Sequence, residues 1–154
     1  MMDEPIKALV IDDEESIRSV MVKILEAEGL VVDTARNGKQ AIEKSKVNFY
    51  HLAFIDIKLP DVEGIELLTT LNNKRPNMIK IIITGHPSLQ NAIRAVNKGA
   101  DAYIVKPFNV ENILSIVREQ LRKQKETKKY SQEKVTEFIE SRVRELEAAN
   151  QRNI

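Results

Sequence analysis

Five short apolar runs alternate with stretches of helical periodicity along most of this chain, and no other feature limits its possible folds as strongly. The apolar runs are mostly β-branched, end at a polar residue, and cover residues 6–11, 30–34, 52–55, 78–83 and 102–105. Runs of this kind are typical of buried strands. Helical patterns lie between and after them, at residues 17–25, 41–42, 65–71, 92–96 and 113–121.

This alternation predicts an α/β domain with a parallel sheet. A parallel crossover needs a helix to return the chain, and such helices cover both faces of the sheet. We therefore expect a three-layer α/β/α domain with five parallel strands over residues 1–121, followed by a C-terminal helical extension.

Polar side chains stand where four of the expected strands end. Asp12 and Asp13 follow the first strand, Asp56 follows the third, Thr84 the fourth and Lys106 the fifth. The C-terminal ends of parallel strands share one edge of the sheet, where ligands bind in such folds. Each carboxylate alone also fits a solvated residue or a helix cap. Their joint placement favours a functional site.

The residue types in this set indicate a divalent cation and phosphoryl chemistry. Three carboxylates at close range raise one another's pKa unless a cation neutralises them. The chain has no cysteine and two histidines, which leaves oxygen ligands and favours Mg²⁺, with Mn²⁺ as the second candidate. A carboxylate beside such a metal can act as a nucleophile and form an acyl phosphate. Lys106 and Thr84 would then hold the phosphoryl oxygens.

Four motifs make the chain from about Ile6 to Leu121 resemble the receiver domain of two-component response regulators, in particular the chemotaxis type. They are V-I-D-D at 10–13, F-I-D-I-K-L-P-D-V-E-G at 54–64, I-I-I-T-G at 81–85 and G-A-D-A-Y-I-V-K-P-F at 99–108. The resemblance implies a flavodoxin-like sheet of strand order 2-1-3-4-5. It also implies a signalling protein whose only catalysis is its own phosphorylation and dephosphorylation. A histidine kinase or phosphotransfer protein would be its phosphodonor.

The resemblance implies a role for each acidic residue of the set. Asp56 would be the phosphoacceptor of a phosphorelay. Asp13, Asp56 and the backbone carbonyl of Lys58 would bind Mg²⁺, and Asp12 would act on the ion through water.

It also implies a switch beside the acceptor. Thr84 and Lys106 would contact the phosphoryl group, and the Lys106–Pro107 bond would be cis. Tyr103 matches the family's aromatic switch, whose ring repacks when Thr84 is drawn toward that group. An amphipathic aromatic at a strand edge is the alternative interpretation of Tyr103.

Two of the family's variable positions flank the acceptor. Lys58 lies two residues after Asp56, and His86 lies two residues after Thr84. We expect a cationic Lys58 and a bulky His86 to obstruct the water that hydrolyses the acyl phosphate, which would lengthen the signal. A solvated loop residue is the alternative for His86.

Three other functions are alternatives to a phosphoacceptor. A phosphatase of the haloacid dehalogenase type needs D-x-D after a strand, whereas Asp12 is followed by D-E and Asp56 by I-K. A flavodoxin-like flavin binder needs a loop that cradles phosphate, which the acidic residues 12–15 would repel. A receiver-like scaffold that is never phosphorylated remains the alternative, although all five functional positions are retained.

The chain beyond Leu121 has a different composition. Residues 122–134 hold one aromatic and no aliphatic side chain, so we expect a basic solvated helix or a linker. In residues 135–154, Val135, Ile139 and Leu146 lie at helical spacing with Arg142 among them, which predicts an amphipathic helix. This segment would be a coiled coil that joins two copies through the fifth helix and tail, or a connector to an output module absent from this chain.

Charge and hydropathy limit the kinds of partner that this chain is expected to bind. The net charge is +1, and the segment after Leu121 holds nine Lys/Arg and six Asp/Glu. Its basic stretch lacks interleaved aromatics and helix-turn-helix elements, which argues against nucleic acid as a partner. The acidic start and the lack of a long apolar stretch predict a cytoplasmic protein without membrane insertion.

Overall fold

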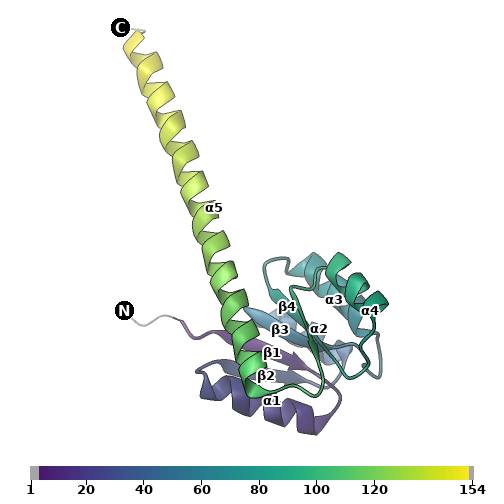
Figure 1. The fold of residues 1–154 in the computed structure, drawn as a ribbon. Coiled ribbons are helices and arrows are strands. Elements are labelled where there is room, and N and C mark those ends of the chain that lie inside the picture. The colour runs from purple at the N-terminus through teal and green to yellow at the C-terminus, as the bar shows by residue number, and fades with distance from the viewer. Residues whose placement is uncertain (1–3, 153–154) are drawn as a thin grey trace. The chain divides into compact units, whose positions relative to one another are not determined.

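Five parallel strands in the order β2-β1-β3-β4-β5 form the centre of the protein in a computed structural model that describes residues 4–152 (Figure 1). The strands are β1 (Lys7–Ile11), β2 (Val31–Ala35), β3 (Leu52–Asp56), β4 (Ile79–Thr84) and β5 (Ala102–Val105). The helices are α1 (Glu15–Ala27), α2 (Gly38–Val47), α3 (Gly64–Lys74), α4 (Leu89–Asn97) and α5 (Val110–Arg152). The expected parallel α/β sheet and its strand order are confirmed.

The two faces of the sheet are covered by different helices, as period-two alternation along the strands requires. One face presents Leu9, Ile55 and Ile82 to a core cluster that also contains Leu68 of α3 and Ala95 of α4. The other face is covered by α1 and the first turns of α5 (Figure 1). The buried residues of these two helices are Met21, Ile24, Leu25, Ile113, Leu114 and Val117. The core therefore has two halves, one on each side of the sheet.

Three strands, β1, β2 and β4, start one residue later than the apolar pattern suggests, and for β2 and β4 the preceding turn explains the difference. Leu30 and Met78 are buried, but their backbone N–H groups complete the preceding turns by donating to the carbonyl oxygens of Leu25 and Arg75 at 3.1 and 3.2 Å. Apolar character marks burial, whereas strand assignment depends on where the backbone hydrogen bonds go. For this reason β2 and β4 begin at Val31 and Ile79.

The chain divides into two units, with the boundary between Gln120 and Leu121. Within the second unit every described side chain from Lys125 to Gln151 is exposed. None of the helices described between residues 4 and 152 is both long and apolar enough to cross a membrane.

Candidate functional site

The turn after β1 separates two adjacent carboxylates. The backbone N–H of Asp12 donates to the carbonyl oxygen of Ala35 at 3.0 Å, so the pairing of β1 with β2 extends beyond the strand. The Asp12 side chain is fully buried, and its Oδ1 accepts from the backbone N–H of Glu14 at 2.9 Å. Asp13 is exposed. One carboxylate thus lies inside the site and the other at its rim.

Asp56 is the last residue of the central strand β3, and a tight loop holds it there. Its side chain is buried, and Oδ1 accepts from the backbone N–H of Lys58 at 3.2 Å. The loop then folds back so that the backbone N–H of Gly64 donates to the carbonyl oxygen of Ile57 at 2.7 Å. A Cβ atom on Gly64 would lie 2.1 Å from the carbonyl oxygen of Asp56, closer than any real contact. Glycine is required here because α3 begins against the backbone of Asp56.

Strands β4 and β5 supply a hydroxyl and an ammonium. The Thr84 side chain is buried, and its Oγ1 accepts from the backbone N–H of His86 at 2.9 Å. Lys106 Nζ lies 2.9 Å from Asp12 Oδ2 and 3.4 Å from Asp56 Oδ2. The bond between Lys106 and Pro107 is cis. Lys106 therefore bridges carboxylates from two different strands.

The site carries more negative than positive charge. Burial raises the pKa of the Asp56 carboxyl, the charge of Asp12 raises it further, and Lys106 opposes both effects. Burial alone would lower the pKa of Lys106, but its hydrogen bond to Asp12 and the charges of both carboxylates outweigh it, so this pKa is raised. Asp12, Asp13 and Asp56 can each offer an oxygen, and these oxygens lie within 4.8 Å of one another. Such an all-oxygen set fits Mg²⁺ or Mn²⁺.

The other predicted residues lie around this cluster. Lys58 and His86 are exposed on the loops that follow β3 and β4. Tyr103 lies on β5 opposite Ile82 and packs its ring against the core cluster. Its hydroxyl is buried and has no hydrogen-bond partner among the described residues.

Asp61, which no sequence pattern marks as a site residue, links the loop between β3 and α3 to α2. Its Oδ1 and Oδ2 each lie 2.9 Å from a backbone nitrogen, of Gly38 and of Lys39. The N–H of Gly38 is the main cause that lowers the pKa of the Asp61 carboxyl. A Cβ atom on Gly38 would lie 2.3 Å from Val62, which shows how closely the loop approaches the helix. The two segments are more than twenty residues apart, so no local pattern reveals the contact.

A second contact that was not predicted from the sequence comes from Arg18 of α1. Its Nη1 donates to the backbone carbonyl of Asp12 at 2.8 Å and holds the turn that carries the carboxylate pair. Arg18 lies in the first turn of α1, six residues after Asp12, and this short separation could have suggested the contact.

A parallel sheet of order 2-1-3-4-5 with acidic residues, a hydroxyl and an ammonium at its C-terminal edge defines a flavodoxin-like α/β domain with a charged site at the edge where such folds bind ligands. Residues 8–118 match the response regulator receiver domain family, and the chain belongs to that family. It is 35% identical over 118 residues to the response regulator ArlR of Staphylococcus saprophyticus, covering 77% of this chain and 53% of that protein. It is also 35% identical over 121 residues to the transcriptional regulatory protein ResD of Bacillus subtilis, covering 79% of this chain and 50% of that protein.

A solved structure agrees with this assignment. The response regulator receiver domain protein (CheY-like) of Methanospirillum hungatei superposes with a TM-score of 0.79 at 40% identity, covering 80% of this chain and 99% of that chain. The present chain spans about half the length of the curated relatives it matches. Residues 8–118 form a receiver domain of two-component signalling.

Proposed function

We propose that Asp56 accepts a phosphoryl group from the phosphohistidine of a histidine kinase or phosphotransfer protein. The observation that carries the proposal is the position of the Asp56 carboxylate, buried at the end of the central strand and 3.4 Å from Lys106 Nζ. In the reaction a carboxylate oxygen of Asp56 forms a bond to phosphorus while the bond from phosphorus to the imidazole nitrogen breaks. The leaving electron pair stays on the imidazole.

Asp12, Asp13, Asp56 and the backbone carbonyl of Lys58 would hold the divalent cation. When bound, Mg²⁺ would supply positive charge to the phosphoryl oxygens and allow an anionic group to approach three carboxylates. Asp12 is the only fully buried member of the three and is already paired with Lys106. We therefore assign it an indirect contact with the ion, through water.

Lys106 and Thr84 would hold the incoming phosphoryl group. Lys106 Nζ already lies between two carboxylates and can donate to a phosphoryl oxygen without leaving the site. Thr84 is the last residue of β4 and lies two residues after Ile82. Ile82 is paired in the sheet with Tyr103 of β5. A shift of Thr84 toward the phosphoryl group would therefore change the space around the Tyr103 ring, which is our proposal for the switch.

The experiment that tests this function is intact-mass measurement after incubation with a small-molecule phosphodonor, with and without Mg²⁺. We expect wild-type protein to gain one phosphoryl group only with the metal, and Asp56→Asn to gain none. Glu66→Gln is the matched control, since it makes the same carboxylate-to-amide change on the exposed side of α3 and should behave as wild type. Equal gain by wild type and Asp56→Asn would place the acceptor elsewhere.

Lys58 and His86 would set the lifetime of the phosphorylated state. Both are exposed beside the acceptor, where they can obstruct an attacking water. We expect Lys58→Ala and His86→Ala to lose the phosphoryl group several-fold faster than wild type, as followed by intact mass over time. Unchanged rates in both variants would contradict this role.

We also propose that catalysis by this domain is limited to its own phosphorylation and dephosphorylation. We further propose that the protein is located in the cytoplasm, where a phosphohistidine donor would be supplied. The scaffold that is never phosphorylated is not favoured, because Asp56, Thr84 and Lys106 all lie in the site.

A further inference from the structure

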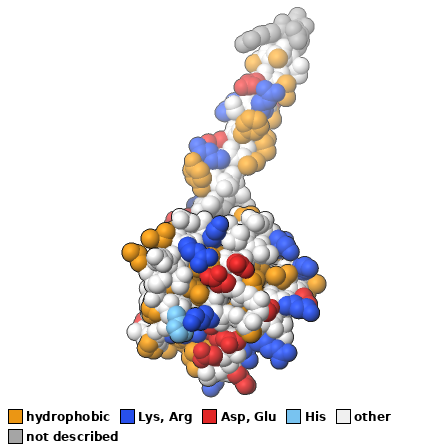
Figure 2. Space-filling view, turned by 90° about the vertical axis from the view of Figure 1, so that its right-hand side faces the viewer, with side chains coloured by type: hydrophobic (Ala, Val, Ile, Leu, Met, Phe, Trp, Pro, Cys, Tyr) orange, Lys and Arg blue, Asp and Glu red, His pale blue; other side chains and the backbone are white. Residues whose placement is uncertain are grey.

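The second unit carries an apolar stripe with nothing covering it among the described residues. Val135, Phe138, Ile139, Val143 and Leu146 have exposed fractions of 58%, 66%, 54%, 46% and 58%. At 3.6 residues per turn they lie on one side of α5. Figure 2 shows hydrophobic side chains in orange along this extension, between charged ones. Single exposed apolar residues are common, but a continuous stripe marks an interaction surface.

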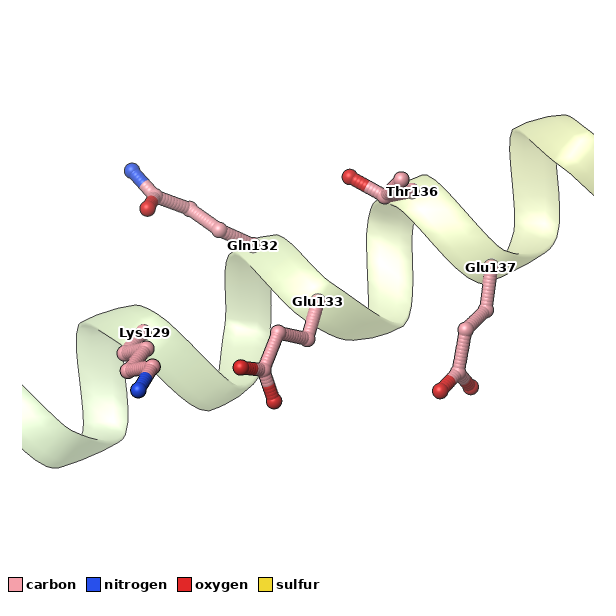
Figure 3. A pocket seen from close by; sticks show the side chains of 5 residues that line it. All are labelled: Lys129, Gln132, Glu133, Thr136 and Glu137. Carbon is pink, nitrogen blue, oxygen red and sulfur yellow. The ribbon is translucent and has the colours of Figure 1, made fainter.

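A different side of the same helix is polar. Figure 3 shows Lys129, Gln132, Glu133, Thr136 and Glu137 projecting from successive turns of α5 around a shallow depression. All five residues come from this one helix, so no second element closes the depression into a ligand site. The helix is therefore amphipathic, with one side suited to water and one suited to a partner.

We propose that residues 135–149 pair with the same residues of a second copy of this chain as a parallel two-stranded coiled coil. In the seven-residue repeat, whose positions are labelled a to g, Ile139 and Leu146 would occupy the core position a. Val135, Arg142 and Ala149 would occupy d positions. The proposal does not depend on phosphorylation of Asp56.

Arg142 explains why two strands are favoured over more. A charged residue at a core position is tolerated where its head group can reach water, which a two-stranded coiled coil allows and a larger bundle does not. Its guanidinium is already paired with Glu145 on the same helix, at 2.8 Å between Nη1 and Oε2. This ion pair supplies a local counter-charge, so two arginines can face each other across the dimer.

The flanking residues select the parallel orientation. In a parallel pair the g and e positions meet, which places Phe138 against Val143 of the partner subunit and Glu145 against Asn150 of the partner subunit. Antiparallel pairing would instead place Phe138 against the partner's Glu145. At these g and e positions parallel pairing joins apolar to apolar and brings no like charges together, while the two Arg142 side chains that face each other are each paired with Glu145 of their own helix. It therefore buries the stripe without leaving a charge unpaired.

Light scattering on the full chain over a range of concentrations tests the dimer. About two heptads make a weak coiled coil, so we expect the mass to rise from 17.6 kDa toward twice that value as concentration increases. Ile139→Glu should stay monomeric. Ser141→Glu is the matched control, because it adds the same charge at an outward c position and should dimerise as wild type. Arg142→Leu should dimerise at a concentration about tenfold lower, because it removes the charge from the seam.

Two results would overturn the dimer. A monomeric mass for both wild type and Arg142→Leu at all concentrations would show that the stripe does not pair. A dimer that persists in Ile139→Glu would place the contact elsewhere on the chain.

The orientation has its own test because the chain has no cysteine of its own. A single cysteine in Leu146→Cys should form an intermolecular disulfide under mild oxidation, since equal a positions meet in a parallel pair. Ser141→Cys, which points outward, is the control and should stay reduced. Faster linkage between Val135→Cys and Leu146→Cys chains than between two Leu146→Cys chains would overturn the parallel arrangement.

Discussion

The hydroxyl group of Tyr103 is buried without a hydrogen-bond partner among the described residues, which makes it a test of residue-level energetics. An unsatisfied buried polar group costs about 1–3 kcal/mol. We expect Tyr103→Phe to raise the free energy of unfolding by about 1 kcal/mol in urea denaturation, because the ring packing is kept and the unpaired oxygen is removed.

Tyr50→Phe is the matched comparison. The Tyr50 hydroxyl is also in the core region, but it donates to Asp33 Oδ2 at 2.6 Å. Its removal should lower the free energy of unfolding by about 1.5–3 kcal/mol, as for other hydrogen bonds to charged groups. Equal effects of the two variants would show that the Tyr103 hydroxyl finds a partner in solution.

At the scale of elements, the contact of Asp61 with the first turn of α2 joins the loop between β3 and α3 to a helix on the same face of the sheet. The carboxylate accepts two backbone N–H groups that the helix itself leaves unpaired. We expect Asp61→Asn to lower the free energy of unfolding by about 0.5–1 kcal/mol at pH 7, because the amide keeps one acceptor oxygen but loses the second acceptor and the negative charge beside the helix N-terminus. Denaturation at several pH values measures it.

The pH dependence of this difference has a defined sign. The pKa of Asp61 is lowered in the folded protein, first by the N–H of Gly38. Its stabilising effect is therefore present above the unfolded pKa of about 3.9 and is lost as the pH falls through the lower folded value. The stability gap between wild type and Asp61→Asn should shrink below about pH 4. A gap that is constant down to acidic pH would mean that charge plays no part in the contact.

At the scale of the whole molecule, the two units differ in what holds them together. Every buried residue in the part of the chain that the structure describes lies before Leu121. We expect a chain ending at Gln120 to keep its melting temperature within about 2 °C, because the described part of the removed segment contains no buried side chain. Calorimetry measures it, and a large drop would show that the helical extension stabilises the receiver unit.

Much of the fold was predictable from the sequence because the strands and helices of a parallel α/β domain each have a local sequence pattern. Apolar runs and helical spacing located all five strands and helices, and the strand ends identified Asp12, Asp56 and Lys106, which the structure brings into contact. The strand order was implied by family resemblance, since no local pattern states which strands are adjacent.

The amino-acid sequence by itself determined the α/β class, the acidic site and the change of composition after Leu121, because local patterns mark each of them. The acidic residues of the site are marked because they directly follow or end apolar runs. Only the tertiary structure decided the contacts that join distant segments. Asp61 at the start of α2 is one of them. Another joins β4 to the turn before β5, where the backbone N–H of Lys80 donates to Asp101 Oδ2 at 2.9 Å. Such contacts depend on where the backbone leaves unpaired groups, which no side-chain pattern records.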